Sequence, residues 1–195
     1  MLNKEHITGI ILAGGKSRRM GIEKGLAELK GKPLIEYAID LMRQLAGTIL
    51  ISANSKAYYA YPFEVVPDVV PHSGPMGGIY SCLQKSKTEI NLVVSCDTPF
   101  IKPQLYDYLL DQGKDHACVV PWHGEDLYEP LCAVYHKSLL DDFRRFIEAG
   151  NFKIPDLFEE VDFLPVKMGR HLSFYHDHLF FNINRQQDLK TAEKL

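Results

Sequence analysis

The chain has 195 residues, of which 46% are apolar and 24% charged, and its formal net charge is −3. This length and composition are typical of a globular domain with a sizeable core, and the slightly acidic balance argues against broad nucleic-acid binding. No stretch approaches the roughly 18 consecutive apolar residues of a membrane helix, and residues 1–8 lack the apolar core of a signal peptide. We therefore expect a cytoplasmic protein that binds neither nucleic acid nor membrane.

The first recognisable element is the apolar run Ile10–Leu12, which predicts a short buried strand. Gly14 and Gly15 follow it directly, and glycine lets a ligand approach the backbone closely. The cations Lys16, Arg18, Arg19 and Lys24 come next. A glycine turn beside clustered cations suggests a polyphosphate site, although a solvated basic loop is the alternative. The glycine spacing fits neither a Walker A loop nor a dinucleotide fingerprint.

Strands and helices alternate over the next part of the chain. Helical spacing of apolar residues starts at Leu34 and ends at Gly47, and Thr48–Ser52 reads as a strand. A helix around Tyr58–Tyr61 and a strand over Phe63–Pro67 follow. Such alternation predicts a parallel sheet with helices on its faces.

A carboxylate stands directly after the next predicted strand. Asp68–Gly78 reads as a rigid loop before a helix from Ile79, and Asn91–Ser95 as a buried strand that leads to Asp97. Ligands bind at the carboxyl ends of parallel strands, and a hard oxygen ligand beside a polyphosphate suggests magnesium. Asp97 could instead cap the helix expected from Pro103.

The second half is predicted to add an antiparallel pair, Ala117–Pro121 and Pro130–Tyr135, joined by a loop that contains Trp122. Trp122 is expected to pack against the protein there, and stacking on a pterin is the alternative. Further helices are expected at Pro103–Gln112, Lys137–Ala149, Pro155–Glu160 and from Gln186, and further strands at Val161–Met168 and Leu179–Ile183. Cys82, Cys96, Cys118 and Cys132 lack zinc-ligand spacing and are expected to be buried free thiols, and His176-Asp177-His178 is expected to be a polar loop.

The glycine loop has a specific spelling. Leu12-Ala13-Gly14-Gly15-Lys16-Ser17-Arg18-Arg19-Met20-Gly21, followed by Lys24, resembles the signature of Rossmann-like nucleotidyltransferases, and most of all that of the molybdenum cofactor guanylyltransferases. The resemblance continues in order through Pro67-Asp68, Gly74–Gly78, Ser95–Pro99, Glu129-Pro130-Leu131 and Asn182-Ile183-Asn184. It spans nearly the whole chain and implies a single three-layer α/β/α domain over residues 1–195, whose mostly parallel sheet has a small antiparallel part.

The resemblance implies a reaction and its residues. GMP would pass from GTP to the phosphate of molybdopterin or Mo-molybdopterin, with Mg²⁺ as cofactor and with other cofactor-biosynthesis proteins or target enzymes as partners. Backbone N–H groups of Ala13–Lys16 would cradle the phosphates. The implied catalytic residues are Arg19, Lys24 and Asp97, with Asp97 on the metal. The implied nucleotide-binding residues are Leu12, Ala13, Gly14, Gly15, Lys24, Ser52, Asp68 and Asp97, and the implied acceptor-binding residues are Asn182 and Asn184.

Three departures from the family pattern leave alternatives open. Glu23 replaces an Asp, Ser52 replaces an Asn that touches guanine in some relatives, and Arg185–Asp188 replaces Thr-Pro-Glu-Asp. The alternatives are a cytidylyltransferase acting on the same pterin, a sugar-phosphate nucleotidyltransferase, and an inactive GTP-binding adaptor. The Ala-Gly-Gly spelling at Ala13 favours GTP over CTP.

Overall fold

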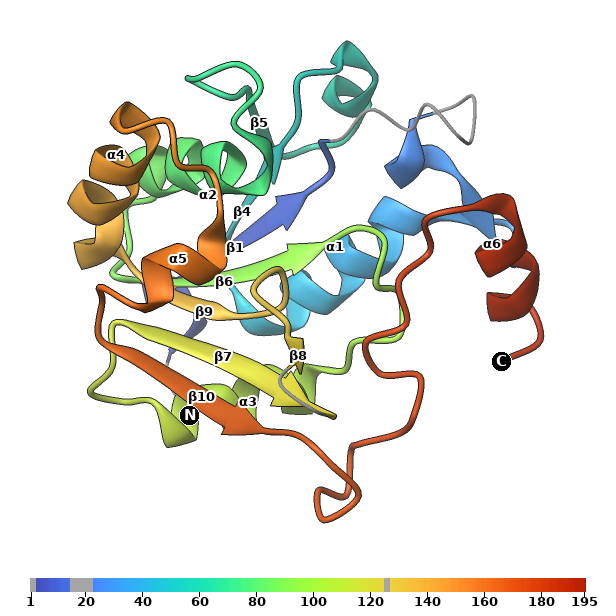
Figure 1. Ribbon diagram of the computed structural model, residues 1–195. Coiled ribbons are helices and arrows are strands. Elements are labelled where there is room, and N and C mark those ends of the chain that lie inside the picture. The colour runs from blue at the N-terminus through green and yellow to red at the C-terminus, as the bar shows by residue number, and fades with distance from the viewer. Residues whose placement is uncertain (1–2, 15–22, 125–126) are drawn as a thin grey trace.

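The computed structural model describes residues 3–14, 23–124 and 127–195. In this part of the chain an eight-stranded mixed sheet lies between two layers of helices (Figure 1). Its strands are β1 (Ile7–Leu12), β4 (Thr48–Ser52), β5 (Glu64–Val66), β6 (Ile90–Ser95), β7 (Cys118–His123), β8 (Leu127–Tyr128), β9 (Val134–His136) and β10 (Phe163–Lys167). A separate hairpin joins β2 (Glu28–Leu29) to β3 (Lys32–Pro33). The predicted α/β class is confirmed.

The strand order makes the carboxyl end of β1 the expected position for a bound ligand. The order is β10-β7-β9-β6-β1-β4-β5, and β5, β4, β1 and β6 are all parallel. Only β9 and β8 run antiparallel to their neighbours in this described sheet, which confirms the small antiparallel part. Leu12 at the end of β1 faces Ser52 on one side and Ser95 on the other. Because the chain winds to opposite sides of β1, this is a topological switch point, where open α/β sheets bind ligands.

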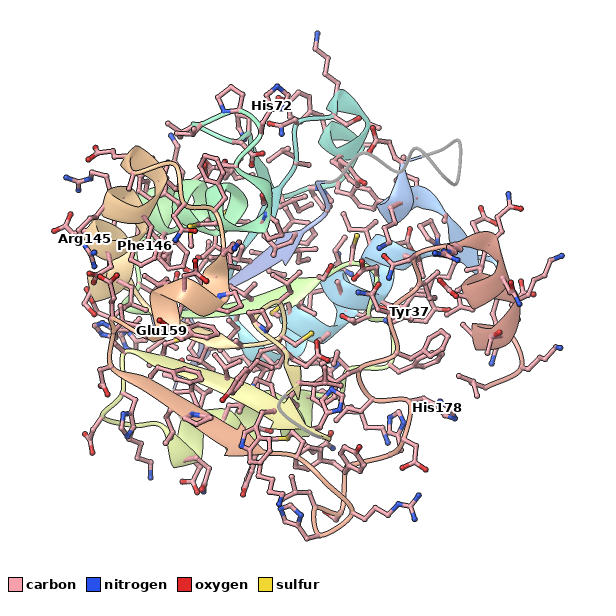
Figure 2. All side chains as sticks on the ribbon, in the orientation of Figure 1. Tyr37, His72, Arg145, Phe146, Glu159 and His178 are labelled. Carbon is pink, nitrogen blue, oxygen red and sulfur yellow. The ribbon has the colours of Figure 1, made fainter. Side chains whose placement is uncertain are left out.

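Helices cover both faces of the sheet. They are α1 (Leu34–Leu45), α2 (Gly74–Lys85), α3 (Pro103–Gln112), α4 (Leu140–Glu148), α5 (Ile154–Phe158) and α6 (Gln186–Ala192). Residues of β6 alternate between two cores, since Leu92 and Val94 pack with α1 and α3 while Val93 packs with α2 and α4. Side chains fill both layers (Figure 2). The predicted three-layer arrangement follows from this alternation.

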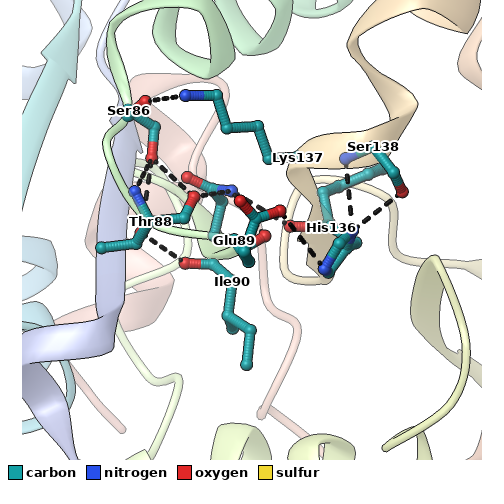
Figure 3. Close-up of polar contacts among 9 residues, drawn as sticks. Ser86, Thr88, Glu89, Ile90, His136, Lys137 and Ser138 are labelled. Carbon is teal, nitrogen blue, oxygen red and sulfur yellow. Dashed lines mark hydrogen bonds and ion pairs between the residues drawn. The ribbon is translucent and has the colours of Figure 1, made fainter.

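A polar network closes the edge of the sheet opposite the switch point (Figure 3). Lys137 donates its Nζ to the Ser86 carbonyl after the end of α2 and its backbone N–H to the Glu89 carbonyl at 2.7 Å. The hydroxyls of Thr8 and Thr88 lie 2.7 Å apart. These contacts pair the polar groups of the segment that connects α2 to β6. The polar residues at this edge therefore have a structural role.

Four local predictions are wrong. Leu179–Ile183 forms turns and irregular chain instead of a strand; Leu179 and Ile183 are fully buried there, so burial alone accounts for its apolar residues. Helix α2 begins at Gly74 instead of Ile79, because Pro75 suits a first helical turn. Trp122 lies within β7, paired with Tyr128 of β8, instead of in the connecting loop. The predicted helix near Tyr58 is a 3₁₀ helix, η3 (Lys56–Ala60).

The four cysteines are buried and unpaired, as predicted. None of the described helices combines the length and the apolar character needed to cross a membrane.

Candidate functional site

Lys24 and Asp97 form an ion pair at the carboxyl edge of the sheet. Lys24 opens the 3₁₀ helix η2 (Lys24–Leu26), and Asp97 follows β6 by two residues. Lys24 Nζ donates to Asp97 Oδ2, and the two side chains are only 18% and 10% exposed. Nζ also donates to Asn184 Oδ1 at 2.6 Å and lies 3.4 Å from Asn182 Oδ1. One ammonium group thus directs its three donors to two distant parts of the chain.

The C-terminal segment reaches Lys24 without being a strand. The Ile183 N–H donates to the Asp97 carbonyl at 2.9 Å, and the Ile183 side chain is buried with Ala27 and Leu29. Asn182 and Asn184 flank this anchor, and the side-chain oxygens of both contact Lys24 Nζ. Helix α6 starts after Arg185, which excludes Asn184 as its N-cap. Figure 1 shows this helix beside the hairpin that follows Lys24.

The second carboxylate oxygen of Asp97 fits a metal ligand. Asp97 Oδ1 is buried and accepts no hydrogen bond from the described residues, which is costly for a carboxylate. The described residues hold no group of three or more His, Cys, Asp or Glu side chains that could bind a metal by themselves. Mg²⁺ commonly takes one or two carboxylates, with phosphate oxygens and water completing its shell. Asp97 is therefore a suitable ligand for a cation whose other ligands include oxygens of a polyphosphate.

Hydrogen bonds to the ends of both neighbouring strands, β4 and β6, hold the end of β1 in place just before the glycine loop. The Ala13 N–H donates to the Ser52 carbonyl at 2.9 Å, and the Leu12 carbonyl accepts the Cys96 N–H at 3.1 Å. The Ala13 carbonyl accepts the Tyr58 hydroxyl at 3.0 Å. The Ala13 N–H is thus engaged within the fold and is not free to join the predicted phosphate cradle, whereas Gly14 is exposed. Gly15 and Arg19 lie outside the described residues.

Ser52 and Asp68 occupy different environments at this edge. Ser52 is 3% exposed, and its hydroxyl faces α2, where a Cβ on Gly78 would lie 2.5 Å from Ser52 Oγ. Asp68 is held by Asn54, whose amide donates to Asp68 Oδ2 at 2.9 Å and accepts the Asp68 N–H at 2.9 Å. The sequence indicates Asn54 only as one of the polar residues that follow β4, and its pairing with Asp68 was not predicted.

A second carboxylate, that of Glu129, lies close enough to Asp97 to feel its charge. His123 Nε2 is 2.9 Å from Glu129 Oε1, and the His123 ring stacks on Phe180 with centroids 4.9 Å apart. Burial raises the pKa of Glu129, the charge of Asp97 raises it further, and the hydrogen bond from His123 opposes both. In the sequence, Glu129 belongs to the matched motif Glu129-Pro130-Leu131, whereas its partner His123 was not singled out.

The nearby thiol is not a nucleophile. Cys132 Sγ lies 3.5 Å from Thr98 Oγ1, and burial raises the pKa of Cys132 to about 12. At neutral pH this thiol is protonated, and the thiolate is the reactive form. The edge therefore combines an ammonium, a carboxylate with a spare oxygen and two amides. This chemistry suits binding and charge neutralisation of phosphates better than covalent catalysis.

Comparison with known proteins agrees with this geometry. Residues 9–162 match the MobA-like NTP transferase domain. The chain is 36% identical to a probable molybdenum cofactor guanylyltransferase of Flavobacterium johnsoniae, over 95% of each chain. It is 33% identical to the molybdenum cofactor guanylyltransferase of Vibrio campbellii, over 100% of this chain and 99% of the relative. The crystal structure of molybdopterin-guanine dinucleotide biosynthesis protein A from Archaeoglobus fulgidus superposes with a TM-score of 0.83 at 29% identity, covering 96% of this chain and 97% of the other.

Proposed function

The chain belongs to the MobA-like NTP transferase family, and we propose that it transfers GMP from GTP to the phosphate of molybdopterin, free or carrying molybdenum. The position of Lys24 is the main support for this proposal. Lys24 contacts Asp97 at the switch point, and it also contacts Asn182 and Asn184 of the C-terminal segment. A cation between these groups is placed to meet the phosphates of two substrates. The names of the relatives supply the nature of those substrates.

The proposed reaction needs no general base. An oxygen of the acceptor phosphate attacks the α-phosphorus of GTP and forms a new O–P bond. The bond from the α-phosphorus to the bridging oxygen breaks, and pyrophosphate leaves with the electron pair. A phosphate monoester has a second pKa of about 6, so the nucleophile is already an anion at pH 7. Catalysis then depends on positioning and charge neutralisation.

Lys24 stabilises negative charge that develops between the two substrates, and removal of such a preorganised group typically costs about 10²–10³ in rate. Asp97 would hold Mg²⁺ through Oδ1. When bound, the ion neutralises charge on phosphate oxygens. Arg19 is proposed to share the role of Lys24.

The two halves of one domain take the two substrates in this proposal. Leu12, Ala13, Gly14, Gly15, Ser52 and Asp68 belong to the nucleotide half, and Asn182 and Asn184 to the acceptor half. The buried hydroxyl of Ser52 supports an indirect role through the packing of α2. A cytoplasmic location and protein partners in cofactor biosynthesis remain predictions from the sequence.

Product analysis tests the proposal. The purified chain is incubated with Mg²⁺, molybdopterin and either GTP or CTP, and pyrophosphate and the dinucleotide product are quantified. We expect product with GTP and little with CTP. Product with CTP alone would identify a cytidylyltransferase, and nucleotide binding without product would support an adaptor.

A further inference from the structure

Tyr58 joins three segments that carry the site. It lies in η3, between β4 and β5, and its side chain is fully buried. Its hydroxyl donates to the Ala13 carbonyl at 3.0 Å, across 45 positions of the chain. A Cβ built on Gly25 would lie 2.8 Å from the Tyr58 hydroxyl and 3.3 Å from Cys96 Sγ. Tyr58 therefore packs beside Gly25, next to Lys24, and near Cys96, next to Asp97.

The hydrogen bond to the Ala13 carbonyl fixes the orientation of the peptide group between Ala13 and Gly14. A trans peptide is planar, so its C=O and N–H point in opposite directions. The Ala13 carbonyl points inward to the buried phenol, and the Gly14 N–H of the same peptide consequently points away from the core. Gly14 is exposed, and its N–H makes no hydrogen bond to the described residues. Burial raises the pKa of Tyr58, so the phenol remains a protonated donor at neutral pH.

We propose that Tyr58 is a positioning residue of the nucleotide site, which aims the Gly14 N–H at a nucleoside triphosphate and sets the spacing of Lys24 and Asp97. The proposal rests on the proposed function, since it names the ligand class of that site. It assigns Tyr58 no contact with the substrate. A backbone N–H held in one direction contributes more to phosphate binding than a mobile one, because ordering it during binding would cost entropy.

The test compares conservative tyrosine variants. Tyr58→Phe keeps the ring and removes the donor to Ala13. We expect the KM for GTP to rise about threefold to tenfold, as for loss of one hydrogen bond, with little change in the KM for molybdopterin. Tyr59→Phe is the adjacent control, because Tyr59 is 62% exposed.

A second control separates positioning from stability. Tyr106 is also fully buried, and its hydroxyl donates to the Val93 carbonyl at 2.5 Å, in the middle of β6. Tyr106→Phe should lower the melting temperature without raising the KM for GTP. An unchanged KM in Tyr58→Phe, or an equal rise in Tyr106→Phe, would overturn the proposal.

A measurement of nucleotide binding in the absence of molybdopterin tests the role of Tyr58 separately from the proposed transfer reaction. Isothermal titration of GTP and CTP with Mg²⁺ needs no turnover, and the phosphate contact does not depend on the base. If the chain transfers no GMP yet Tyr58→Phe weakens triphosphate binding, the proposed reaction fails and the Tyr58 proposal stands. If the chain binds no nucleoside triphosphate, both fail.

Discussion

Lys24 Nζ donates to Asn184 Oδ1 at 2.6 Å across 160 positions of the chain. The same ammonium group is paired with Asp97, so the C-terminal segment is fastened directly to the edge of the sheet. Lys24 is therefore both a structural link and the central charge of the proposed site. Its variants should affect both substrates.

Lys24→Ala should lower kcat/KM by about 10²–10³, because it removes a preorganised cation and leaves Asp97 without its partner. Lys32→Ala is the control, since Lys32 also pairs with a carboxylate, that of Asp40, but makes none of the contacts of Lys24. Steady-state kinetics with both substrates check this. Near wild-type kinetics in Lys24→Ala would remove Lys24 from the mechanism.

Asn184→Ala should raise the KM for molybdopterin about threefold to tenfold and leave the KM for GTP nearly unchanged, since a hydrogen bond to a charged group is lost on the acceptor side. Asn182→Ala should have a smaller effect, because its oxygen is 3.4 Å from Nζ, against 2.6 Å for Asn184. Asn151→Ala is the matched control, as Asn151 bonds to Asp156 elsewhere. A selective rise in the KM for GTP would contradict the division into two halves.

Gly78→Ala should destabilise the fold by about 1–3 kcal/mol through overpacking. The added Cβ would lie 2.5 Å from Ser52 Oγ, while the nearest Leu12 atom is 3.3 Å away at the end of a flexible side chain. Ser52→Ala removes the closest atom, so the double variant should recover most of the lost stability. Urea unfolding of the four proteins in this cycle measures the coupling. Additive effects would show that Ser52 does not limit the approach of α2.

Glu129→Gln should change the pH dependence of stability. The raised pKa of Glu129 means that the folded state keeps the proton to higher pH than the unfolded state. The corresponding stability is complete below the unfolded pKa of about 4.3 and is lost as pH rises through the folded pKa. Relative to Glu129→Gln, the wild type should lose unfolding free energy as pH rises from the unfolded pKa of about 4.3 through the higher folded pKa.

Asp162→Asn provides a control of opposite sign. The hydrogen bond from His116 lowers the pKa of Asp162, so its stabilisation is present above the unfolded pKa and is lost as pH falls through the folded pKa. Urea unfolding across the pH range measures both variants. The same slope in both would show that burial of Glu129 does not control its titration.

Local sequence patterns were sufficient for much of the scaffold. The apolar spacing that predicted a helix from Leu34 matches the buried face of α1, and Thr48–Ser52 and Pro103–Gln112 have the predicted bounds. In these elements the periodicity directly reflects which face is buried. Asp97 was found because a carboxylate after a buried strand requires a partner.

Long-range contacts explain what was missed. Leu179–Ile183 has a strand-like composition, but strand formation requires a free sheet edge, which no local pattern reveals. The contact of Tyr58 with Ala13 and the pairing of Asn54 with Asp68 join positions 45 and 14 residues apart. Both depend on how the strand ends converge, so only the assembled sheet shows them.

The central measurement is the binding of GTP and CTP to the wild type and to Asp97→Asn, titrated with and without Mg²⁺. The variant preserves the shape of Asp97 but lacks the charge beside Lys24 and the anionic ligand for the ion. We predict that the wild type binds GTP in preference to CTP and that Mg²⁺ strengthens this binding. Asp97→Asn should lose the Mg²⁺ dependence. Equal Mg²⁺ dependence in both proteins, or no binding of either nucleotide, would contradict a nucleotide and metal site at the end of β6.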